Sequence, residues 1–521
     1  MSSALKQLNN YGPLMNMVCG PDINYFVNCY PKFTNFAMQI EPNKCNTVIG
    51  FNKTLTFSFN HSGDFAGQTY FKVKLPEIKL TIDNPSQKLL GRWIDYVGCY
   101  LFSKISININ NIQVSEISDN MMYIIQEFTT ATAKRQLVDK MLGMVPELVA
   151  PVCTMQCLSL TLPATELIIP LPFWFCTDPS AFIPICCCNS ALPIDIIVEV
   201  NPLDKLLIVN PNVRVQQISS IDIECFTNYI YIDTATRNTF VTQPQTYLIE
   251  QFINNGKLEG GSSKDIQLNI SGICKEIFIA AQHKSYIEKK SKNIELIDSE
   301  GNTITKFTPS NQHTNFAITA FDQGINYVNT IEGFAPGHHY STIGTTYGDL
   351  IEKIDFNLGG TKLLDTNDSN IFNTVQPLWY HTAAPRNTGL HCYSFALNPE
   401  NACPTGCIDF TMINNANVLI KLHNTINTQT VSRNATTFAN ENIDMDYVFA
   451  ANYPRMAVSA EVAKSPLFNF VVPNISPIMN GSKIDTLYTY TEGQPVYYYY
   501  IYAINYNFLL FSNGMCGLKY S

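Results

Sequence analysis

Three cysteines in the segment CYSFALNPENACPTGCIDF, residues 392–410, are the first side chains in the sequence that could carry chemistry. Cys392 begins the segment, and Pro-Thr-Gly separates Cys403 from Cys407. Cysteines at such spacing can bind zinc or exchange disulfides, whereas a proline and a glycine between them favour a tight turn. The segment could therefore be a metal knuckle, a redox site or a turn.

The surroundings of these cysteines favour the turn. A structural zinc site needs four ligands, usually supplied as two close pairs, and the other close pair, Cys153 and Cys157, lies in a different part of the chain. Pro-Thr-Gly is also unlike the C-x-x-C motif at the start of a redox helix. We interpret the segment as a strand, a loop turned by Pro404 and Gly406, and the beginning of the next strand.

Histidines and acidic residues elsewhere have ordinary spacing. His338 and His339 are adjacent, so on a strand they would point to opposite faces, and no H-E-x-x-H motif surrounds them or His381. We interpret all three as polar loop residues. The acidic segment DTNDSN, residues 365–370, lacks the central Gly and closing Glu of a calcium loop, and we interpret it as an Asx-rich turn.

Motifs of the common enzyme classes do not occur in the sequence. It contains no G-x-S-x-G elbow, no G-x-x-x-x-G-K-[ST] loop and no G-x-G-x-x-G turn. Paired carboxylates that hydrolyse glycosides have no fixed spacing, so that alternative stays open. We assign no catalytic residue, no cofactor or cofactor-binding residue and no metal ligand, and we expect a protein that is not an enzyme.

The most aromatic stretch is QPVYYYYIYAINYNFLLF, residues 494–511. Its consecutive tyrosines would present aromatic surface on both faces of a strand, which is typical of a strand buried on one side and docked against a neighbour on the other. A stacking platform for nucleic acid would interleave Arg and Lys, and this stretch has neither.

Composition points to a folded protein with large buried surfaces. Apolar residues make up 46% of the chain and charged residues only 14%, and the net charge is −9. Low charge with many aromatics suits surfaces that are buried against partners. Bulk electrostatic binding of nucleic acid needs clustered Lys and Arg, so we expect no direct nucleic acid contact. The one dense basic stretch, HKSYIEKKSK at 283–292, is interpreted as a solvated loop.

The cysteine count bears on the compartment. The N-terminal residues have no apolar h-region, and no window reaches about 18 uninterrupted apolar residues. We therefore expect a protein made and kept in the cytosol, whose 16 cysteines are mostly reduced. The consecutive Cys186, Cys187 and Cys188 are expected to pack as small hydrophobic residues.

Alternation of apolar and polar residues with a period of two dominates the chain and predicts half-buried strands. One segment, NMMYIIQEFTTATAKRQLVDKML at 120–142, instead has helical spacing and suits one helix or two short ones; no comparably clear helix follows residue 250. Many short strands in 521 residues predict two sandwiches or jelly rolls, divided at the polar segment 233–244. The clearest alternating segments are 54–60, 70–76, 104–110, 353–360 and 417–424.

Several segments, in order along nearly the whole chain, resemble the major capsid proteins of nucleocytoplasmic large DNA viruses, the double jelly-roll capsid protein family. The most recognisable is NTVQPLWYHTAAPRNTGLHCYSFALNPENACPTGCIDFTMINNANVLIKL, residues 373–422. The others are ALKQLNNYGPLMNMVCGPDINYFVNCYPKFTNFAM, HSGDFAGQTYFKVKLP, LIIPLPFWFCTDPSAFIPI, NYIYIDTATRNTF and YAINYNFLLFSNGMCGLKYS.

The resemblance implies an all-β fold of two tandem eight-stranded jelly rolls with a few short helices in loops. It divides the chain into an N-terminal arm at 1–25, a first jelly roll at 26–235 and a second at 236–521. It also implies a structural protein of the virion, assembled in the host cytoplasm. Three chains would form a homotrimer, a pseudo-hexagonal capsomer that meets neighbouring capsomers and tiles an icosahedral shell.

The resemblance further implies where two segments lie in the shell. The arm before about residue 25 would lie at the inner side, near minor capsid proteins or the inner viral membrane, and loops that include 283–347 would face outward. The alternative from another class is a two-domain β-sandwich that binds glycans or acts on them, because jelly rolls host both functions.

Overall fold

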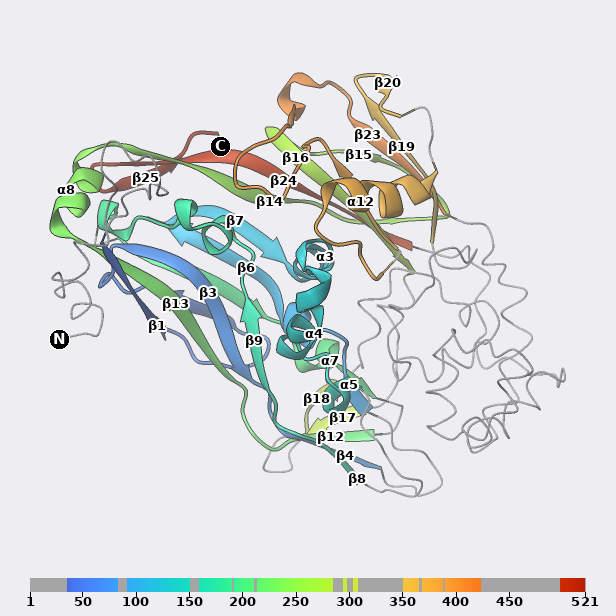
Figure 1. The fold of residues 1–521 in the computed structure, drawn as a ribbon. Helices are drawn as coiled ribbons and strands as arrows, with labels where there is room; N and C mark the ends of the chain where they lie inside the picture. The colour runs from blue at the N-terminus through green and yellow to red at the C-terminus, as the bar shows by residue number, and fades with distance from the viewer. Residues whose placement is uncertain are drawn as a thin grey trace, which may run out of the picture.

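The computed structural model describes residues 35–82, 91–149, 159–189, 192–209, 213–283, 294–297, 303–307, 350–364, 368–387, 389–422 and 497–520. Within these residues the chain is mostly strands, and they form two jelly rolls, as the alternating segments predicted (Figure 1). None of the helices in the described part is long and apolar enough to cross a membrane. Four predicted features lie outside the described residues: the arm 1–25, His338 and His339, the Cys153/Cys157 pair, and nearly all of the outward loops.

The first jelly roll consists of eight strands that hydrogen-bond in the order β7-β6-β10-β2-β1-β13-β3-β9. The order divides at β1, because its residues 36–43 pair with β13 while Lys44 and Cys45 pair with β2. The sheet thus folds over into two layers of four. The strands are β1 (Phe36–Cys45), β2 (Thr54–Ser58), β3 (Phe65–Lys74), β6 (Phe102–Ile109), β7 (Ile112–Ser118), β9 (Glu166–Pro170), β10 (Ile194–Val200) and β13 (Asp222–Ile232).

Apolar residues of the alternating pattern fill the space between these two layers. Leu55 and Phe57 of β2 are fully buried, and Phe57 meets Phe71 of β3 edge to face at 5.3 Å. Phe71 in turn contacts Phe102 of β6 at 4.9 Å. Aromatic contacts between residues of opposite layers show that the period of two has placed the apolar side chains on the inner faces.

The second jelly roll repeats the first with the same order of strands. Its larger layer has the order β14-β24-β16-β21, which matches β1-β13-β3-β9, and its smaller layer has the order β15-β23-β19-β20, which matches β2-β10-β6-β7. The strands are β14 (Gln245–Gly260), β15 (Ser263–Gln267), β16 (Ile273–His283), β19 (Ile351–Leu358), β20 (Thr361–Lys362), β21 (Leu390–Ser394), β23 (Asn417–Leu422) and β24 (Tyr497–Ser512), with β22 (Ile408–Asp409) and β25 (Met515–Leu518) added at the ends of the larger layer.

Helices occupy the connections between strands. The predicted helical segment forms two helices, α3 (Asp119–Thr129) and α4 (Thr132–Met141). The polar segment between the jelly rolls forms α8 (Thr234–Thr242), whose first turn is capped by the Asp233 carboxylate at 2.8 Å from the Thr236 amide. The shorter helices of the first jelly roll are α2 (Val97–Tyr100), α5 (Pro146–Val149), α6 (Trp174–Thr177), α7 (Leu203–Leu206), η2 (Pro179–Ala181) and η3 (Ile185–Cys187).

The second jelly roll contains a helical segment that the sequence did not predict. It consists of η6 (Ile371–Val375), with π-helical turns, and α12 (Gln376–Tyr380), and it follows β20 as α3 follows β7. Its apolar residues lie on more than one side, with Phe372 buried and Leu378 75% exposed, so no helical period was visible.

A small sheet joins the two halves of the sequence. Its strand order is β18-β17-β12-β4-β8. In it β12 (Val213–Gln217), which precedes the second jelly roll in the sequence, pairs in parallel with β17 (Ile294–Ile297), which follows β16. Such a pair ties segments that are far apart in the sequence. The remaining strands are β4 (Ile78–Ile82), β8 (Ser159–Leu162), β18 (Thr303–Phe307) and the pair β5 (Gly91–Trp93) and β11 (Leu207–Val209).

Candidate functional site

The cysteine segment is an exposed turn. Cys392 is buried on β21, but Cys403 and Cys407 are exposed free thiols. The loop is closed by Thr405, whose hydroxyl donates to the Asn398 carbonyl at 3.0 Å and accepts from the Asn398 amide at 2.8 Å. Among the described residues, no group of three or more His, Cys, Asp or Glu side chains could hold a metal ion.

The strands around this turn are shorter than we expected. β21 ends at Ser394, and the predicted strand after the turn is only the two residues of β22, followed by the 3-10 turn η7 (Phe410–Met412). The Asp409 carboxylate accepts a hydrogen bond from the Thr411 amide at 2.9 Å, which caps η7 and diverts the chain from an extended course.

The residues through which the two jelly rolls contact each other, here called the seam, contain a buried ionic network. Arg386 follows α12 and reaches into the first jelly roll, where its guanidinium donates to both carboxylate oxygens of Asp139 at 2.8 and 2.9 Å. It also donates to Glu127 at 3.0 Å and to the Tyr96 hydroxyl. Bidentate pairing of this kind fixes direction as well as distance, so it sets how one jelly roll sits on the other.

Arg135 of α4 completes the network from the other side. Its guanidinium donates to the Glu127 carboxylate at 3.1 Å, to the Glu127 carbonyl at 2.7 Å and, across the seam, to the Ala384 carbonyl at 2.8 Å. The Arg386 amide donates to the same Glu127 carboxylate at 2.8 Å. Glu127 is therefore held by two arginines and a backbone amide although its side chain is only 3% exposed.

Protonation within the network follows from burial and charge. Burial alone would lower the pKa of Arg386, but the hydrogen bonds that it donates to Asp139 and the charge of Glu127 outweigh burial and raise that pKa. Burial also raises the pKa of Tyr96, and the nearby Glu127 carboxylate adds to the rise. Arg386 is thus always charged, and Tyr96 stays a neutral hydrogen-bonding group.

His381 is not the polar loop residue that its sequence context predicted. Its side chain is 1% exposed and lies between two carboxylates, with Nε2 3.4 Å from Glu276 and Nδ1 3.3 Å from Glu400. Its ring also contacts Phe128 of α3 at 5.0 Å and Phe278 of β16 at 6.1 Å. The correction has a physical reason: folding of the second jelly roll brings β16 and the loop that carries Glu400 to the imidazole, and docking of the first jelly roll adds Phe128.

The pKa values of the two carboxylates beside His381 are shifted in opposite directions. Burial raises the pKa of Glu276, although Lys275 opposes the rise. Burial would also raise the pKa of Glu400, but hydrogen bonds from His381 and from the hydroxyl and amide of Thr382 outweigh it and lower that pKa.

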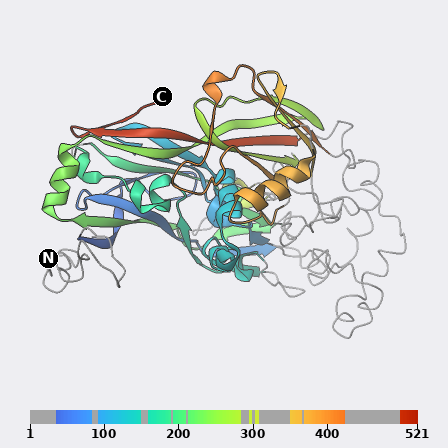
Figure 2. The ribbon, with the colours of Figure 1, turned by 45° about the horizontal axis from the view of Figure 1, so that its top comes forward.

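Tyrosines of β24 line the seam on both faces of the strand. Tyr498, Tyr500 and Tyr502 of β24 belong to the core of the first jelly roll, whereas Tyr497 and Tyr499 belong to the core of the second. The prediction that this strand is buried on one side and docked on the other is confirmed. Figures 1 and 2 both show β14 and β24 running along the first jelly roll, and the Gln251 side chain of β14 donates to the Val114 carbonyl of β7.

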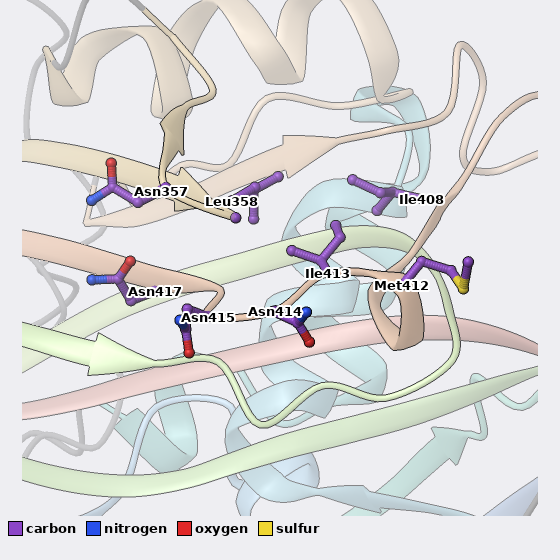
Figure 3. Close-up of a pocket in the computed structure, with 10 residues that line it drawn as sticks. Asn357, Leu358, Ile408, Met412, Ile413, Asn414, Asn415 and Asn417 are labelled. Atoms are coloured by element: carbon purple, nitrogen blue, oxygen red, sulfur yellow. The ribbon is translucent and has the colours of Figure 1, made fainter.

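A pocket of about 810 Å³ opens on the second jelly roll (Figure 3). It is formed by the β19–β20 turn and the segment after β22, and among the described residues that line it there is no Asp or Glu and no aromatic ring. Paired acids for glycan hydrolysis are therefore not supplied there. Its lining is Asn357, Leu358, Gly359, Gly360, Ile408, Met412, Ile413, Asn414, Asn415 and Asn417.

Comparisons with known proteins agree with this geometry. Residues 24–233 match the family model described as major capsid protein N-terminus. Residues 236–461 match the model described as large eukaryotic DNA virus major capsid protein. The chain belongs to the major capsid proteins of large eukaryotic DNA viruses. The resemblance seen in the sequence is confirmed.

Similar capsid proteins are known from several viruses. The chain is 26% identical over 497 residues to the major capsid protein of Phaeocystis pouchetii virus, covering 81% of this chain and 94% of the relative. It is 22% identical over 552 residues to that of Chrysochromulina ericina virus, with the same coverage.

Solved structures of capsid proteins share the fold. A quasi-atomic model of the PBCV-1 virus capsid aligns with a TM-score of 0.59 at 18% identity, covering 96% of this chain and 100% of that one. The Faustovirus major capsid protein also aligns with a TM-score of 0.59, at 11% identity, covering 96% and 94%. The double jelly roll of this capsid protein is therefore shown by the strand order and by similar structures together.

Sequence reasoning missed the ionic residues of the seam. Glu127, Asp139 and Arg386 lie in two segments about 250 residues apart, and nothing in their local spacing marks them as partners. One signal was available, because Arg386 lies inside the 373–422 stretch, the most recognisable part of this capsid protein.

Proposed function

We propose that three copies of this chain form a homotrimeric capsomer of pseudo-hexagonal outline that tiles an icosahedral shell. The observation that carries the proposal is the repeated strand order of two jelly rolls that the seam holds side by side. Three chains with two similar modules each supply six modules, which approximates sixfold packing while keeping closed threefold symmetry. A rigid seam suits this role, because movement between the two jelly rolls would disturb the pseudo-hexagonal packing of the capsomers.

The proposed division of the chain is an arm at 1–25, a first jelly roll at 26–235 and a second at 236–521. The two family matches, which meet between residues 233 and 236, support the boundary. So does α8, which begins at Thr234 and links the last strand of one jelly roll to the first of the next.

The partners follow from this role. Neighbouring capsomers would contact the outer rim of the trimer, and the arm would meet minor capsid proteins or the inner viral membrane. We propose assembly in the host cytoplasm, no direct contact with nucleic acid and no catalysis. The acidic balance of the chain, with a net charge of −9, supports the absence of nucleic acid contact.

The mass and outline of the purified protein test this proposal. Light scattering should give three times the chain mass of 58.5 kDa, and negative-stain electron microscopy should show particles of hexagonal outline. A stable monomer that binds glycans would overturn the proposal in favour of the glycan-binding alternative. Substituting Asn414 in the pocket would then test whether that pocket binds the sugar.

A further inference from the structure

One ring nitrogen of His381 is occupied by an ionised carboxylate. Nδ1 lies 3.3 Å from Oε1 of Glu400. Both oxygens of that carboxylate also accept from Thr382, Oε1 from its amide at 2.9 Å and Oε2 from its hydroxyl. Hydrogen bonds of this kind favour the charged form, in agreement with the lowered pKa of Glu400. An ionised carboxylate only accepts, so the hydrogen of the imidazole lies on Nδ1.

The other ring nitrogen faces a second buried carboxylate. Nε2 lies 3.4 Å from Oε2 of Glu276, and neither atom has another hydrogen-bond partner among the described residues. With its one hydrogen on Nδ1, a neutral imidazole is an acceptor at Nε2, and an ionised Glu276 is an acceptor too. Two acceptors would then face each other where the side chains are 1 and 5% exposed, which is costly. One further proton on either atom makes this contact a hydrogen bond.

The charges around the site favour this additional proton. Lys275 of β16 lies 3.7 Å from Glu276, but its Nζ is closer to Glu250 of β14, at 2.6 Å. Together with Glu400 the group holds three carboxylates and one lysine, so negative charge is in excess while His381 is neutral. A proton shared by His381 and Glu276 reduces this excess, and burial makes that reduction more favourable.

The other elements that pack around the site supply no charge that would replace the proton. Glu127 of α3 is held by Arg135 and Arg386. On β21, burial and the nearby Glu276 raise the pKa of the Cys392 thiol, which therefore stays neutral. On β24, burial raises the pKa of Tyr506 to about 12, so its hydroxyl stays neutral as well.

The ring of His381 also lies at the contact between the two jelly rolls. Phe128 of α3 packs against it at 5.0 Å, a distance at which an aromatic ring attracts a cation more strongly than a neutral ring. Two residues further on, the Ala383 amide donates to the Phe128 carbonyl at 3.1 Å, and the Ala384 carbonyl accepts from Arg135 of α4 at 2.8 Å. The segment that carries His381 is thus bonded directly to α3 and α4, and a change in the charge of the ring acts on that contact.

We propose that His381, Glu276 and Glu400 form a site that binds one proton near neutral pH, and that this proton helps to fasten the second jelly roll to α3 of the first. The proton belongs to the pair of His381 and Glu276 rather than to either residue, because the two groups titrate together. The inference concerns a single chain and does not depend on the trimer.

The sign of the pH dependence follows from this arrangement. The unfolded chain releases the proton near the ordinary pKa of histidine, about 6.5, whereas the folded chain keeps it to higher pH. The stability that the proton contributes is therefore fully present below that value and is lost as the pH rises through the folded pKa. Mild alkali should weaken the contact with α3, and a moderate fall below neutral pH should leave the site closed.

Urea unfolding of the wild type and of His381→Gln between about pH 6.5 and 9 tests the proton site. Glutamine is polar and cannot take up the proton. Where the folded wild type holds one proton that the unfolded chain has released, its unfolding equilibrium constant rises about tenfold per pH unit, and the constant of the variant should rise less steeply by up to that factor. The matched control is His61→Gln at an exposed histidine of the first jelly roll, and it should follow the wild type.

Glu276→Gln gives a second test that keeps the histidine. Its amide can donate to Nε2 without an added proton, so this variant should also lose the pH dependence. Unlike His381→Gln, it should be more stable than the wild type at about pH 9, where the wild type has lost the proton. A purely structural role for the two side chains would lower the stability of both variants by the same factor at every pH. If His381→Gln does not fold, Glu276→Gln alone decides the test.

Amide hydrogen exchange of α3, residues 119–129, shows whether the contact between the jelly rolls responds. At about pH 6.5 this helix should exchange faster in His381→Gln than in the wild type, and at about pH 9 the two proteins should exchange at similar rates, because the wild type has then lost the proton. Comparing the proteins at the same pH removes the intrinsic effect of pH on exchange.

Two results would overturn the proposal. Unfolding constants of wild type, His381→Gln and Glu276→Gln that run parallel over the whole pH range would show that the site holds no additional proton. A pH-dependent difference in unfolding without any difference in the exchange of α3 would show that the proton does not act on the contact between the jelly rolls. Neither result bears on the proposed capsomer, which the mass and outline of the purified protein test separately.

Discussion

The cysteine turn and two residues of the seam, His381 and Arg386, lie close together in the sequence, yet they differ in exposure and in their partners. The turn has the residue types that could do chemistry, and its two thiols are exposed and bind nothing among the described residues. The seam has an ordinary histidine and arginine, and both are surrounded by carboxylates that arrive from elsewhere in the chain. The difference teaches that residue types suggest which chemistry is possible, whereas long-range packing decides which charged side chains are buried and therefore need a partner.

The largest effect is expected from substituting Arg386, which tests whether the seam depends on its ionic network. Arg386→Ala leaves the Asp139 carboxylate without its arginine partner and Glu127 with Arg135 as its remaining arginine, and removing one member of a buried pair lowers the free energy of unfolding by about 3 kcal/mol. Urea unfolding of the purified protein measures the change. Lys421→Ala, which breaks the exposed pair with Glu352, is the control and should lower it by less than about 1 kcal/mol. Equal effects of the two substitutions would show that the seam does not lock the jelly rolls.

Substituting the glycine of the turn should lower the stability of the protein, whereas substituting its exposed cysteines should not. Gly406 has a φ of 150°, and a Cβ there would lie 2.7 Å from the Phe395 carbonyl oxygen. Gly406→Ala should therefore lower the free energy of unfolding by about 1–3 kcal/mol in the same measurement. Gly517→Ala, where a Cβ meets nothing within 4 Å, should change it very little. A harmless Gly406→Ala would mean that the turn relaxes without difficulty.

The pH dependence of two carboxylates sharpens the account of the seam. The lowered pKa of Glu400 means that its charged form stabilises the fold above its unfolded pKa of about 4.3, and that this stability is lost as the pH falls through the folded pKa. Glu400→Gln should lower the free energy of unfolding by about 1 kcal/mol at pH 7, and the difference should vanish in acid.

Glu276 should behave in the opposite sense. Its raised pKa means that the fold favours the protonated form, so wild-type stability falls as the pH rises from the unfolded to the folded pKa. Glu276→Gln should therefore become relatively more stable than wild type with rising pH. Thermal unfolding of wild type and both variants between pH 4 and 8, within the range where the protein refolds, measures how the stability difference between each variant and wild type changes with pH. Slopes of the same sign would contradict the opposite environments of the two carboxylates.

The smallest effect is expected at the cysteines themselves. Cys403→Ser and Cys407→Ser, alone or together, should change the free energy of unfolding by less than about 0.5 kcal/mol, because both side chains are exposed. A chelator should leave the wild-type melting temperature unchanged. A large shift with either treatment would restore the metal or redox interpretation of this segment.

Local periodicity predicted most of the fold correctly. The alternation at 54–60 and 417–424 became β2 and β23, and the helical spacing at 120–142 became α3 and α4. Periodicity did not predict the structure where the apolar residues do not lie on a single face or where a cap ends a strand early. The helical segment 371–380 has both buried and exposed apolar residues, and β22 is cut short by the Asp409 cap. The tyrosines of β24 were correctly predicted to dock on both sides, but the sequence could not name the surface they dock on.

The sequence by itself determined the period of the strands, the two-fold repeat of an all-β module and the membership of a capsid protein family, because these depend on neighbouring residues and on the order of segments. Only the tertiary structure decided that His381 is buried between Glu276 and Glu400, and that Arg386 joins two helices of the other jelly roll. The physical reason is that buried charges and docked faces are satisfied by partners from other segments of the chain, and local patterns carry no record of which partners those are.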